Sequence, residues 1–279
     1  MDYGQPVRFG VFITPVATKT PVQLASLADE LGYEVIGVQD HPYQRRFFDT
    51  WTLLTAMAMR TERVSLFPDV ANLPLRPPSM LAKAAASLDI LSGGRFELGL
   101  GAGGFWDAIK AWDGPVRTPG ESVSALEEAI QVIRLLWSGQ HGIRFDGEFY
   151  RLAGAHSGPV PAHPIGIWLG AYRPRMLSLV GRFADGWVPS YGYVKEPELR
   201  EANRRIDESA REAGRDPRSI RRVLNAGYME AEQLVGLVVD VGMDTFLVGD
   251  DADTMRSFAS EVAPRVREEV ESRRSRRAD

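Results

Sequence analysis

The sequence predicts a (β/α)8 TIM barrel of the α/β class, and two observations carry that prediction. Short apolar runs alternate with amphipathic helical patterns eight times over roughly 250 residues, which suits a closed barrel better than an open doubly wound sheet. Glycine-rich or polar segments follow several of these runs, at the strand ends where α/β proteins place their chemistry. We therefore expect one barrel domain, residues 1–267, followed by a charged tail, residues 268–279.

The expected strands are short apolar runs, at residues 8–13, 34–38, 63–67, 95–100, 165–169, 186–189, 221–225 and 245–248. The expected helices have apolar residues at helical spacing, and several open with Pro, Ser, Thr or Asp. They lie at residues 21–31, 50–59, 79–91, 121–137, 174–181, 196–213, 231–241 and 251–266. One large interruption, residues 140–164 after the fourth helix, predicts a β-hairpin and then a loop over the barrel mouth.

Charge and cysteine content exclude several classes of protein. The formal net charge is −4 and the pI is about 5.7, so there is no basic field of the kind that binds nucleic acid. The arginines near the C-terminus are typical of a solvated tail, and the lack of cysteine excludes disulfides and thiolate metal sites. No leader pattern occurs, and no apolar run reaches the roughly 18 residues of a membrane span. We expect a cytoplasmic protein that binds a small molecule, without nucleic acid or membrane as partner.

Two acidic segments follow expected strands and could carry chemistry. Asp40 and His41 end the second strand, where an imidazole could exchange a proton with a bound substrate. A helix-capping aspartate beside a surface histidine explains the same pattern about equally well. Asp69 follows the third strand, where a buried acid is costly unless it is paired or faces a ligand. A simple turn aspartate after Pro68 is the competing interpretation.

The glycine-dense loop 99–104 follows the fourth strand and leaves backbone N–H groups uncovered for a flat or anionic ligand. It matches G-x-G-x-x-G literally, but a helix stands where a dinucleotide-binding fold needs its second strand, so a nicotinamide site is disfavoured. The four histidines lack the spacing of a metal site, and no nucleophile elbow is present. Glycoside hydrolysis by paired carboxylates stays an alternative interpretation, because Asp40, Asp69 and Asp107 could face one cavity.

Four motifs in order resemble the bacterial luciferase-like (LLM) flavin- and deazaflavin-dependent oxidoreductases. They are PSMLAKAAASLDILSGGRFELGLGAG at 78–103, PGE with LWSG at 119–121 and 136–139, IWLG at 167–170 and ADGW at 184–187. The resemblance runs from the first strand to at least Trp187. It implies a (β/α)8 barrel that binds reduced FMN or the deazaflavin coenzyme F420 at its C-terminal mouth.

The resemblance also implies roles for individual residues. His41 is the expected proton donor or acceptor, with Asp40 orienting it. Asp69 and Val70 match a bulge with a non-proline cis peptide behind the bent ring, and Asn72 would face the cofactor. Further expected cofactor contacts are Gly101, Ala102 and Gly103 beside the ring system and Gly170, Ala171, Tyr172 and Arg173 around the phosphate. The Arg173 guanidinium is expected to bind that phosphate, because Tyr172 and Arg173 replace the small residues common there.

Substrate and reaction follow less directly. Sugar-phosphate dehydrogenases of the deazaflavin branch have a glutamate where this chain has Gly104, which argues against that substrate class. Tyr43, Phe105 and Trp106 predict a mostly apolar pocket, although nearby tryptophans such as Trp112 could simply be packed. We expect F420-dependent hydride transfer to or from a small organic substrate. The alternative is an FMNH2-dependent monooxygenase that uses O2, and a non-catalytic flavin-binding barrel or a glycoside hydrolase is less favoured.

The resemblance also implies pairing of two chains through the helices after strands two and three. The Ala- and Met-rich faces of residues 50–59 and 80–87 could serve as a homodimer interface, or they could be barrel-facing core.

Overall fold

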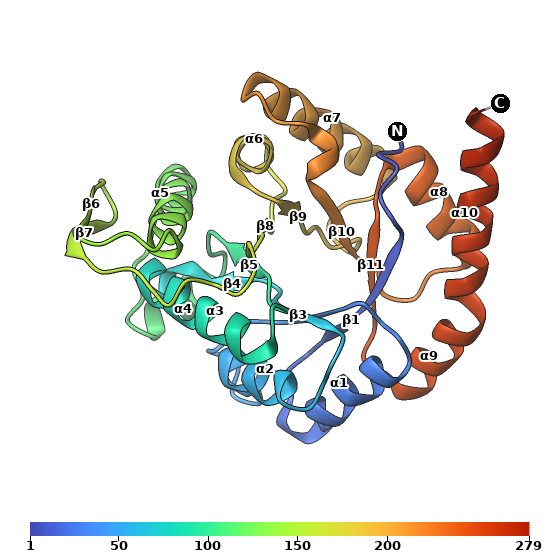
Figure 1. Ribbon diagram of the computed structural model, residues 1–279, viewed down its shortest axis with the longest axis horizontal. Helices are drawn as coiled ribbons and strands as arrows, with labels where there is room; N and C mark the ends of the chain where they lie inside the picture. The colour runs from blue at the N-terminus through green and yellow to red at the C-terminus, as the bar shows by residue number, and fades with distance from the viewer. Residues whose placement is uncertain (279) are drawn as a thin grey trace.

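A computed structural model describes residues 1–278 and shows a parallel barrel surrounded by helices (Figure 1). Its barrel strands are β1 (Arg8–Ile13), β2 (Val35–Val38), β3 (Ser65–Pro68), β4 (Ala71–Asn72), β5 (Leu98–Gly101), β8 (Ile167–Leu169), β9 (Gly186–Trp187), β10 (Arg221–Asn225) and β11 (Thr245–Val248). They are hydrogen-bonded in the order β3-β2-β1-β11-β10-β9-β8-β5-β4. Every pairing in this sheet is parallel, as the predicted fold requires.

The third barrel strand is split in two, which reconciles nine observed strands with the eight predicted. β3 pairs with β2 and β4 pairs with β5, and Asp69 and Val70 separate the two halves. A bridge between Leu66 and Phe96 closes the ring, because the Leu66 N–H donates to Arg95 O at 2.8 Å and Leu66 O accepts from the Glu97 N–H at 2.9 Å. The predicted (β/α)8 barrel is therefore confirmed.

The helices cover the outside of the barrel, one or more after each strand. They are α1 (Pro21–Glu30), α2 (Thr50–Ala58), α3 (Pro78–Ser92), α4 (Trp106–Ala111), α5 (Pro119–Trp137), α6 (Pro174–Phe183), α7 (Glu196–Glu212), α8 (Ala231–Gly236), α9 (Ala252–Ser257) and α10 (Ala263–Ala278). Single turns of π-helix, Leu237–Val241 and Phe258–Val262, continue α8 and α9. Among residues 1–278, no helix combines the length and apolarity that a membrane crossing needs.

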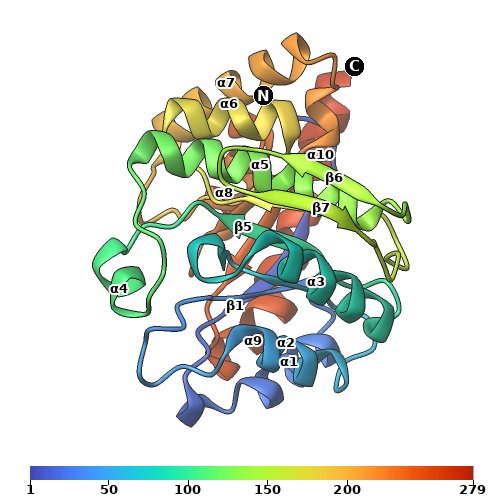
Figure 2. The same ribbon diagram turned by 90° about the vertical axis from the view of Figure 1, so that its left-hand side faces the viewer.

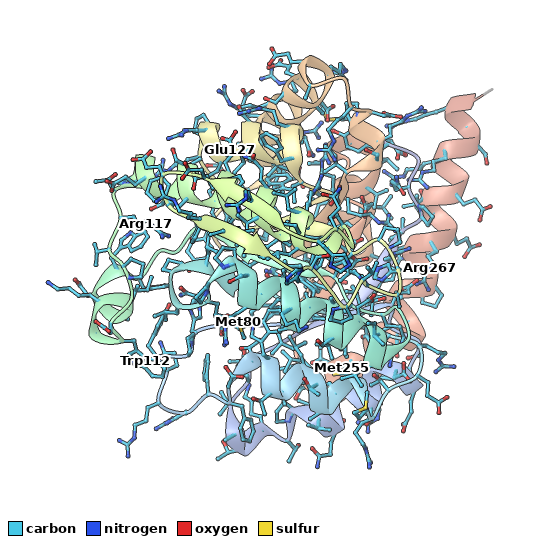
Figure 3. The ribbon with its side chains drawn as sticks, turned by 60° about the vertical axis from the view of Figure 1, so that its left-hand side comes forward. Met80, Trp112, Arg117, Glu127, Met255 and Arg267 are labelled. Atoms are coloured by element: carbon cyan, nitrogen blue, oxygen red, sulfur yellow. The ribbon has the colours of Figure 1, made fainter. Side chains whose placement is uncertain are left out.

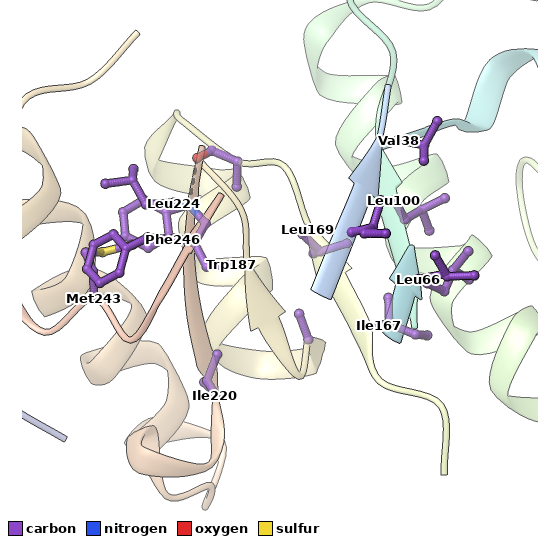
Figure 4. Close-up of a cluster of buried hydrophobic side chains, with 14 of the residues drawn as sticks. Val38, Leu66, Leu100, Ile167, Leu169, Trp187, Ile220, Leu224, Met243 and Phe246 are labelled. Carbon is purple, nitrogen blue, oxygen red and sulfur yellow. Dashed lines mark hydrogen bonds between the residues drawn. The ribbon is translucent and has the colours of Figure 1, made fainter. Parts of the chain in front are cut away.

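Alternating residues of the strands build two apolar layers. Outward-facing side chains such as Leu66, Leu100 and Leu169 pack under the helices (Figure 4). Inward-facing side chains form a smaller cluster inside the barrel, made by Val35, Phe67, Trp168, Val188, Val223 and Leu247 with the partly buried Phe12. Because these side chains fill the barrel interior, a ligand can enter only at the ends.

The predicted hairpin is present, but the loop after it does not lie over the mouth, because the N–H groups of Ala162 and His163 bind Asp89 near the end of α3. β6 (Ile143–Asp146) and β7 (Arg151–Ala155) are antiparallel and lie side-on across α5 and α3 (Figure 2). The Glu128 carboxylate, from the middle of α5, accepts hydrogen bonds from the backbone N–H groups of residues 148–150 at 2.8–3.1 Å. Lys83 of α3 donates to Gly158 O at 2.8 Å. These contacts hold the insertion against the wall of the barrel and leave the mouth uncovered by it.

The C-terminal residues are a helix and not a solvated tail. α10 runs without a break from Ala263 to Ala278, across the expected boundary at residue 267. Val270 is buried at 2% exposure, and Arg274 binds Asp2 through two hydrogen bonds of 2.8 and 2.9 Å. The arginines that suggest a tail by composition therefore tie this helix to the N-terminal segment.

Candidate functional site

The C-terminal ends of the barrel strands bring Gly101 and Gly170 against Val70. The peptide bond between Asp69 and Val70 is cis, as the resemblance implies. A Cβ atom added to Gly101 would lie 2.8 Å from the Val70 side chain, and one added to Gly170 would lie 3.1 Å from it. A side chain at either position would therefore press on Val70, which lies between β5 and β8. The bulge and two of the predicted cofactor-binding glycines form one surface.

The glycine loop after β5 is equally tight. Gly103 has φ +98°, and a Cβ there would meet Pro74 at 2.7 Å and the Trp106 ring at 2.9 Å. Ala102, between these glycines, packs partly buried against the core. Gly104 has open space around its Cα, so the absence of a side chain there is not enforced by packing. The loop keeps its backbone close to the mouth, which suits a flat ligand.

Asp40 does not orient His41, which corrects the sequence-based expectation. The Asp40 side chain is fully buried and accepts from Arg76 Nε and Nη2, both at 2.9 Å, and from the Asn72 N–H at 3.0 Å. Arg76 also reaches Asp49, the N-cap of α2, at 2.6 Å. Asp40 is thus a structural clamp between β2, β4 and α2. Its charge acts on His41 through space only.

His41 is held instead by Tyr43. The two side chains meet at 2.6 Å between His41 Nδ1 and Tyr43 Oη, and the Phe105 ring lies edge-on to the imidazole at 5.2 Å between centroids. Burial lowers the His41 pKa, and the Asp40 charge opposes that effect. Burial and the same charge raise the pKa of Tyr43 to about 12, so the phenol keeps its proton at neutral pH. The Tyr43 hydroxyl occupies His41 Nδ1, which leaves Nε2 free to exchange a proton with a ligand.

Three side-chain oxygens at the mouth are enclosed without a donor. They are Asp69 Oδ2, Asn72 Oδ1 and Asn225 Oδ1. Burial raises the pKa of Asp69 to about 7, with the Asn225 amide opposing the rise. Buried polar atoms are normally hydrogen-bonded, so unpartnered ones gathered at one end of a barrel indicate a place for a ligand.

The segment after β8 has the properties of an anion site. The Arg173 side chain makes no hydrogen bond or ion pair with any residue in 1–278, and it precedes α6, whose N-terminus carries no side-chain cap. Tyr172, 40% exposed, accepts from the Ser190 N–H at 3.1 Å, and buried Ala171 accepts from the Trp187 indole at 2.8 Å. These contacts fix the turn, and a free guanidinium beside a helix N-terminus suits phosphate.

Aromatic side chains lie after β2 and β5 at the mouth of the barrel. Phe105 is 58% exposed, and its ring centroid lies 6.1 Å from that of Tyr43. Trp106 begins α4 and packs beside Gly103. Trp112, at the far end of α4, is 56% exposed and stands away from the body of the protein (Figure 3), so it is not a core residue. Exposed aromatic surface of this kind favours an apolar substrate.

Sequence reasoning missed Arg76, Ser190 and Asn225. Asn225 ends β10 and donates to Ser190 Oγ, beyond β9, at 3.2 Å. Ser190 and Asn225 lie at the ends of later barrel strands, where polar residues face the mouth. The same rule predicted the site residues after strands two to five, and applied to the later strands it would have found these two. Within residues 1–278 no group of three acidic or histidine side chains could hold a metal, and Asp40 is committed to Arg76 and unavailable for glycoside chemistry.

The chain was compared with known proteins. Residues 7–233 match the luciferase-like monooxygenase family. The chain is 33% identical over 222 residues to a 5,10-methylenetetrahydromethanopterin reductase of Methanolobus tindarius, covering 77% of this chain and 63% of that protein. It is 32% identical over 212 residues to an F420-dependent glucose-6-phosphate dehydrogenase of Nocardia farcinica, covering 73% and 62%. The chain thus spans slightly less than two thirds of the length of these relatives.

Solved structures share the fold at low identity. An F420-dependent secondary alcohol dehydrogenase in complex with an F420-acetone adduct superposes with a TM-score of 0.84 at 18% identity, covering 94% of this chain and 99% of that one. The coenzyme F420-dependent tetrahydromethanopterin reductase of Methanopyrus kandleri gives 0.80 at 19% identity, covering 93% and 99%. The family match covers residues 7–233, which is most of the chain, and the barrel with a bulge at its third strand agrees with it. The chain therefore belongs to the luciferase-like monooxygenase family.

Proposed function

We propose that this protein is an F420-dependent oxidoreductase that transfers a hydride to or from a small, largely apolar organic substrate. The observation that carries the proposal is the surface made by Val70, Gly101 and Gly170. His41 follows β2 and Arg173 follows β8, so both lie at the same end of the barrel. A flat ring with a phosphate-bearing side chain fits this arrangement. The name of the F420-dependent relative supports F420 over FMN, whereas the structural neighbours include proteins with either cofactor.

Each part of the site has a role in binding the cofactor. Val70 would support one face of the ring, and the backbone of residues 101–103 would pass beside it without side chains that clash. Arg173 and the N–H groups at the start of α6 would hold the phosphate. When bound, a reduced deazaflavin supplies the hydride.

His41 would manage the proton that accompanies the hydride. Reduction of a carbonyl needs a proton at the new alkoxide oxygen, and His41 Nε2 can deliver it while Nδ1 stays bonded to Tyr43. The Tyr43 hydroxyl can accept from Nδ1–H both in the imidazolium and in the neutral ring, so Nδ1 would keep its proton while Nε2 gives one up or takes one. Asp40, fixed by Arg76, favours the charged imidazolium electrostatically. In the opposite direction His41 accepts the proton of an alcohol.

The substrate is proposed to be uncharged and largely apolar. Phe105, Tyr43 and Trp106 form the rim, and Gly104 offers no carboxylate where sugar-phosphate dehydrogenases of the family have a glutamate. The resemblance to glucose-6-phosphate dehydrogenases therefore does not extend to this loop. A carbonyl or alkene carried by an apolar body fits the rim.

The first experiment compares the binding of oxidised F420 and of FMN to the purified protein by fluorescence quenching. Selective binding of F420 supports the proposal. If FMN binds more tightly, the protein is to be assayed as an FMNH2-dependent monooxygenase with O2, the alternative that the exposed aromatic rim also suits. Absence of binding by both cofactors, oxidised and reduced under anaerobic conditions, would refute the proposal.

We further propose a homodimer. Met59 at the end of α2 and Met80, Ile90 and Leu91 of α3 are 44–63% exposed, while Met57 is fully buried, so only part of the Ala- and Met-rich surface is core. Met80 is labelled in Figure 3. Exposed apolar side chains of this number favour an interface. The double substitution Met80→Asp and Leu91→Asp is expected to give a monomer by light scattering, and an unchanged mass would reject this interface. The cytoplasmic location stays a prediction.

A further inference from the structure

Asp69 is an aspartate in an apolar place. Its carboxylate lies above the inward-facing layer of the barrel, and a Cβ added to Gly37 would be 2.9 Å from Asp69 Oδ2, from Leu247 and from Phe67 alike. Oδ2 is enclosed and meets no donor. The residue is 8% exposed, which leaves Oδ1 as the oxygen that can reach the mouth.

The charges around Asp69 do not compensate an anion there. No lysine, arginine or histidine in residues 1–278 forms an ion pair with it. From β2 the neighbouring Asp40 is neutralised by Arg76, and from β11 Asp250 is bound by Lys19 and the Thr14 N–H. From the segment after β8, Tyr172 faces Asp69, and its raised pKa keeps the phenol neutral. Asn225, from β10, lowers the Asp69 pKa through hydrogen bonding, but burial outweighs this effect and the amide brings no charge.

A carboxylic acid suits this environment better than a carboxylate does. A protonated Asp69 places a carbonyl oxygen, Oδ2, in the enclosed apolar position, where an uncharged acceptor costs far less than a charge. The proton then sits on Oδ1, toward the mouth. Such a group is a hydrogen-bond donor inside an otherwise acceptor-rich pocket floor, since Asn72 and Asn225 present oxygens there.

We propose that Asp69 binds ligand as a neutral carboxylic acid, donating its proton in a hydrogen bond to a carbonyl oxygen of the ring bound at the mouth. This inference rests on the proposed function, because it takes the ring to be that of F420. Asp69 is a positioning residue in this scheme and transfers no proton. Its pKa of about 7 supports the geometry, because further burial by the ligand would favour the neutral form still more.

Binding of oxidised F420 to the wild-type protein and to Asp69→Asn, measured between pH 5.5 and 8.5, tests the proposal. The amide keeps an N–H donor but does not titrate. The ratio of the two affinities cancels ionisation of F420 and of every other residue. We expect the wild type to weaken relative to Asp69→Asn above pH 7, approaching about tenfold per pH unit. Asp69→Leu, which has no donor, should bind more weakly than Asp69→Asn throughout.

Two results would overturn the proposal: a ratio that stays constant from pH 5.5 to 8.5, or Asp69→Leu binding as tightly as Asp69→Asn. Thermal unfolding without ligand gives a separate readout. Asp69→Asn should melt at a higher temperature than the wild type at pH 8, and the difference in melting temperature should be much smaller at pH 5. The same difference at both pH values would contradict a neutral Asp69. If no protein binds F420 at any pH, the proposed function fails along with the hydrogen bond, whereas the unfolding data still decide the charge state of Asp69.

Discussion

The two ends of the barrel differ in how completely their buried polar groups are hydrogen-bonded, with the Arg76-bound Asp40 as the exception at the C-terminal end. At the N-terminal end, buried charges are fully bonded. Asp29 accepts from the N–H groups of residues 62–64 at 2.7–3.0 Å, and fully buried Arg222 donates to Asn203, Asp207 and Ile220 O at 2.6–2.9 Å. At the C-terminal end, Asp69, Asn72 and Asn225 each keep an enclosed oxygen without a donor.

The difference separates stability from function within one fold. Both ends are built from residues that flank the same strands, so sequence position alone does not explain the contrast. Bonds that are complete in the free protein contribute to the free energy of unfolding, whereas atoms left unbonded are a cost that a ligand can remove. Substitutions at the two ends should therefore affect different measurements.

The largest expected effect is on turnover, at the C-terminal end. Replacing His41 with Ala should lower kcat by about 10²–10⁴-fold, because the proton carrier is lost, and leave the free energy of unfolding nearly unchanged. Steady-state kinetics with F420 and urea unfolding measure the two quantities. Tyr43→Phe is the matched control, since it keeps the imidazole and removes its hydroxyl partner, and it should shift the pH profile of kcat with a smaller loss. Equal loss of stability and activity in His41→Ala would break the contrast between the two ends.

The next effect is on stability, at the N-terminal end. Asp29→Ala leaves three backbone N–H groups without their acceptor and should lower the free energy of unfolding by about 3 kcal/mol or more. Burial acts to raise the Asp29 pKa, but the hydrogen bonds from these N–H groups lower it by more. The Asp29 pKa therefore lies below its ordinary value. Asp253→Ala, at a side chain 97% exposed, is the control and should change stability by less than about 0.5 kcal/mol. Similar losses for the two variants would show that the bonding at this end is not what stabilises it.

The fold could be predicted from the sequence, and so could the place of His41 after β2, whereas the hydrogen bonds around this residue could not. Periodicity located each barrel strand to within a few residues, because strand residues alternate between two apolar layers. The resemblance located the cis peptide and the glycines around Val70. The partner of Asp40 could not be found this way, because Arg76 is 36 residues away and only the closed barrel brings the two together.

The same limit explains the wrong predictions. Residues 268–279 are charged enough to predict a tail, and only the contacts of Arg274 and Arg277 with Asp2 and Asp240 show that residues 268–278 pack as a helix. The loop after the hairpin was expected over the mouth because it belongs to an insertion, but the Glu128 contacts that hold the hairpin to α5 depend on the face that this helix exposes. Local pattern determines which elements form, whereas their neighbours depend on how the chain closes.

A smaller effect tests the proposed phosphate site. Arg173→Ala should weaken binding of a phosphate-bearing cofactor by about 10- to 100-fold, the range for one charge-assisted hydrogen bond. Arg175→Ala is the neighbouring control, because its guanidinium is already bonded to Gly120 O and Ser124 at 2.8–2.9 Å. Quenching titrations at two salt concentrations measure both, and the wild type should be the more salt-dependent. Arg175→Ala weakening binding as much as Arg173→Ala would move the phosphate elsewhere.

The smallest expected effect returns to the N-terminal end. His163 Nδ1 lies 2.6 Å from the buried Asp89 Oδ1, and Glu97 is 3.6 Å from its Nε2. The interaction with Glu97 is the main cause that raises the His163 pKa, and the charges of Asp89 and Glu97 raise it further. Burial opposes this rise. The protonated ring therefore stabilises the native state fully below the unfolded pKa of about 6.5, and this contribution is lost as pH rises through the higher folded pKa.

Relative to His163→Gln, the wild type should thus lose stability as the pH rises above 6.5, by about 1 kcal/mol or less because the side chain is 29% exposed. Urea unfolding of both proteins between pH 5.5 and 8.5 measures the difference. Asp69→Asn should gain stability over the wild type as the pH rises across the same range. Asp69→Asn and His163→Gln each remove a titrating group, one at each end of the barrel. Each should therefore make the free energy of unfolding depend less on pH. If His163→Gln instead matches the wild type at every pH, the N-terminal end draws its stability from the hydrogen bonds of Asp89 to the backbone N–H groups of Ala162 and His163 and not from the histidine charge.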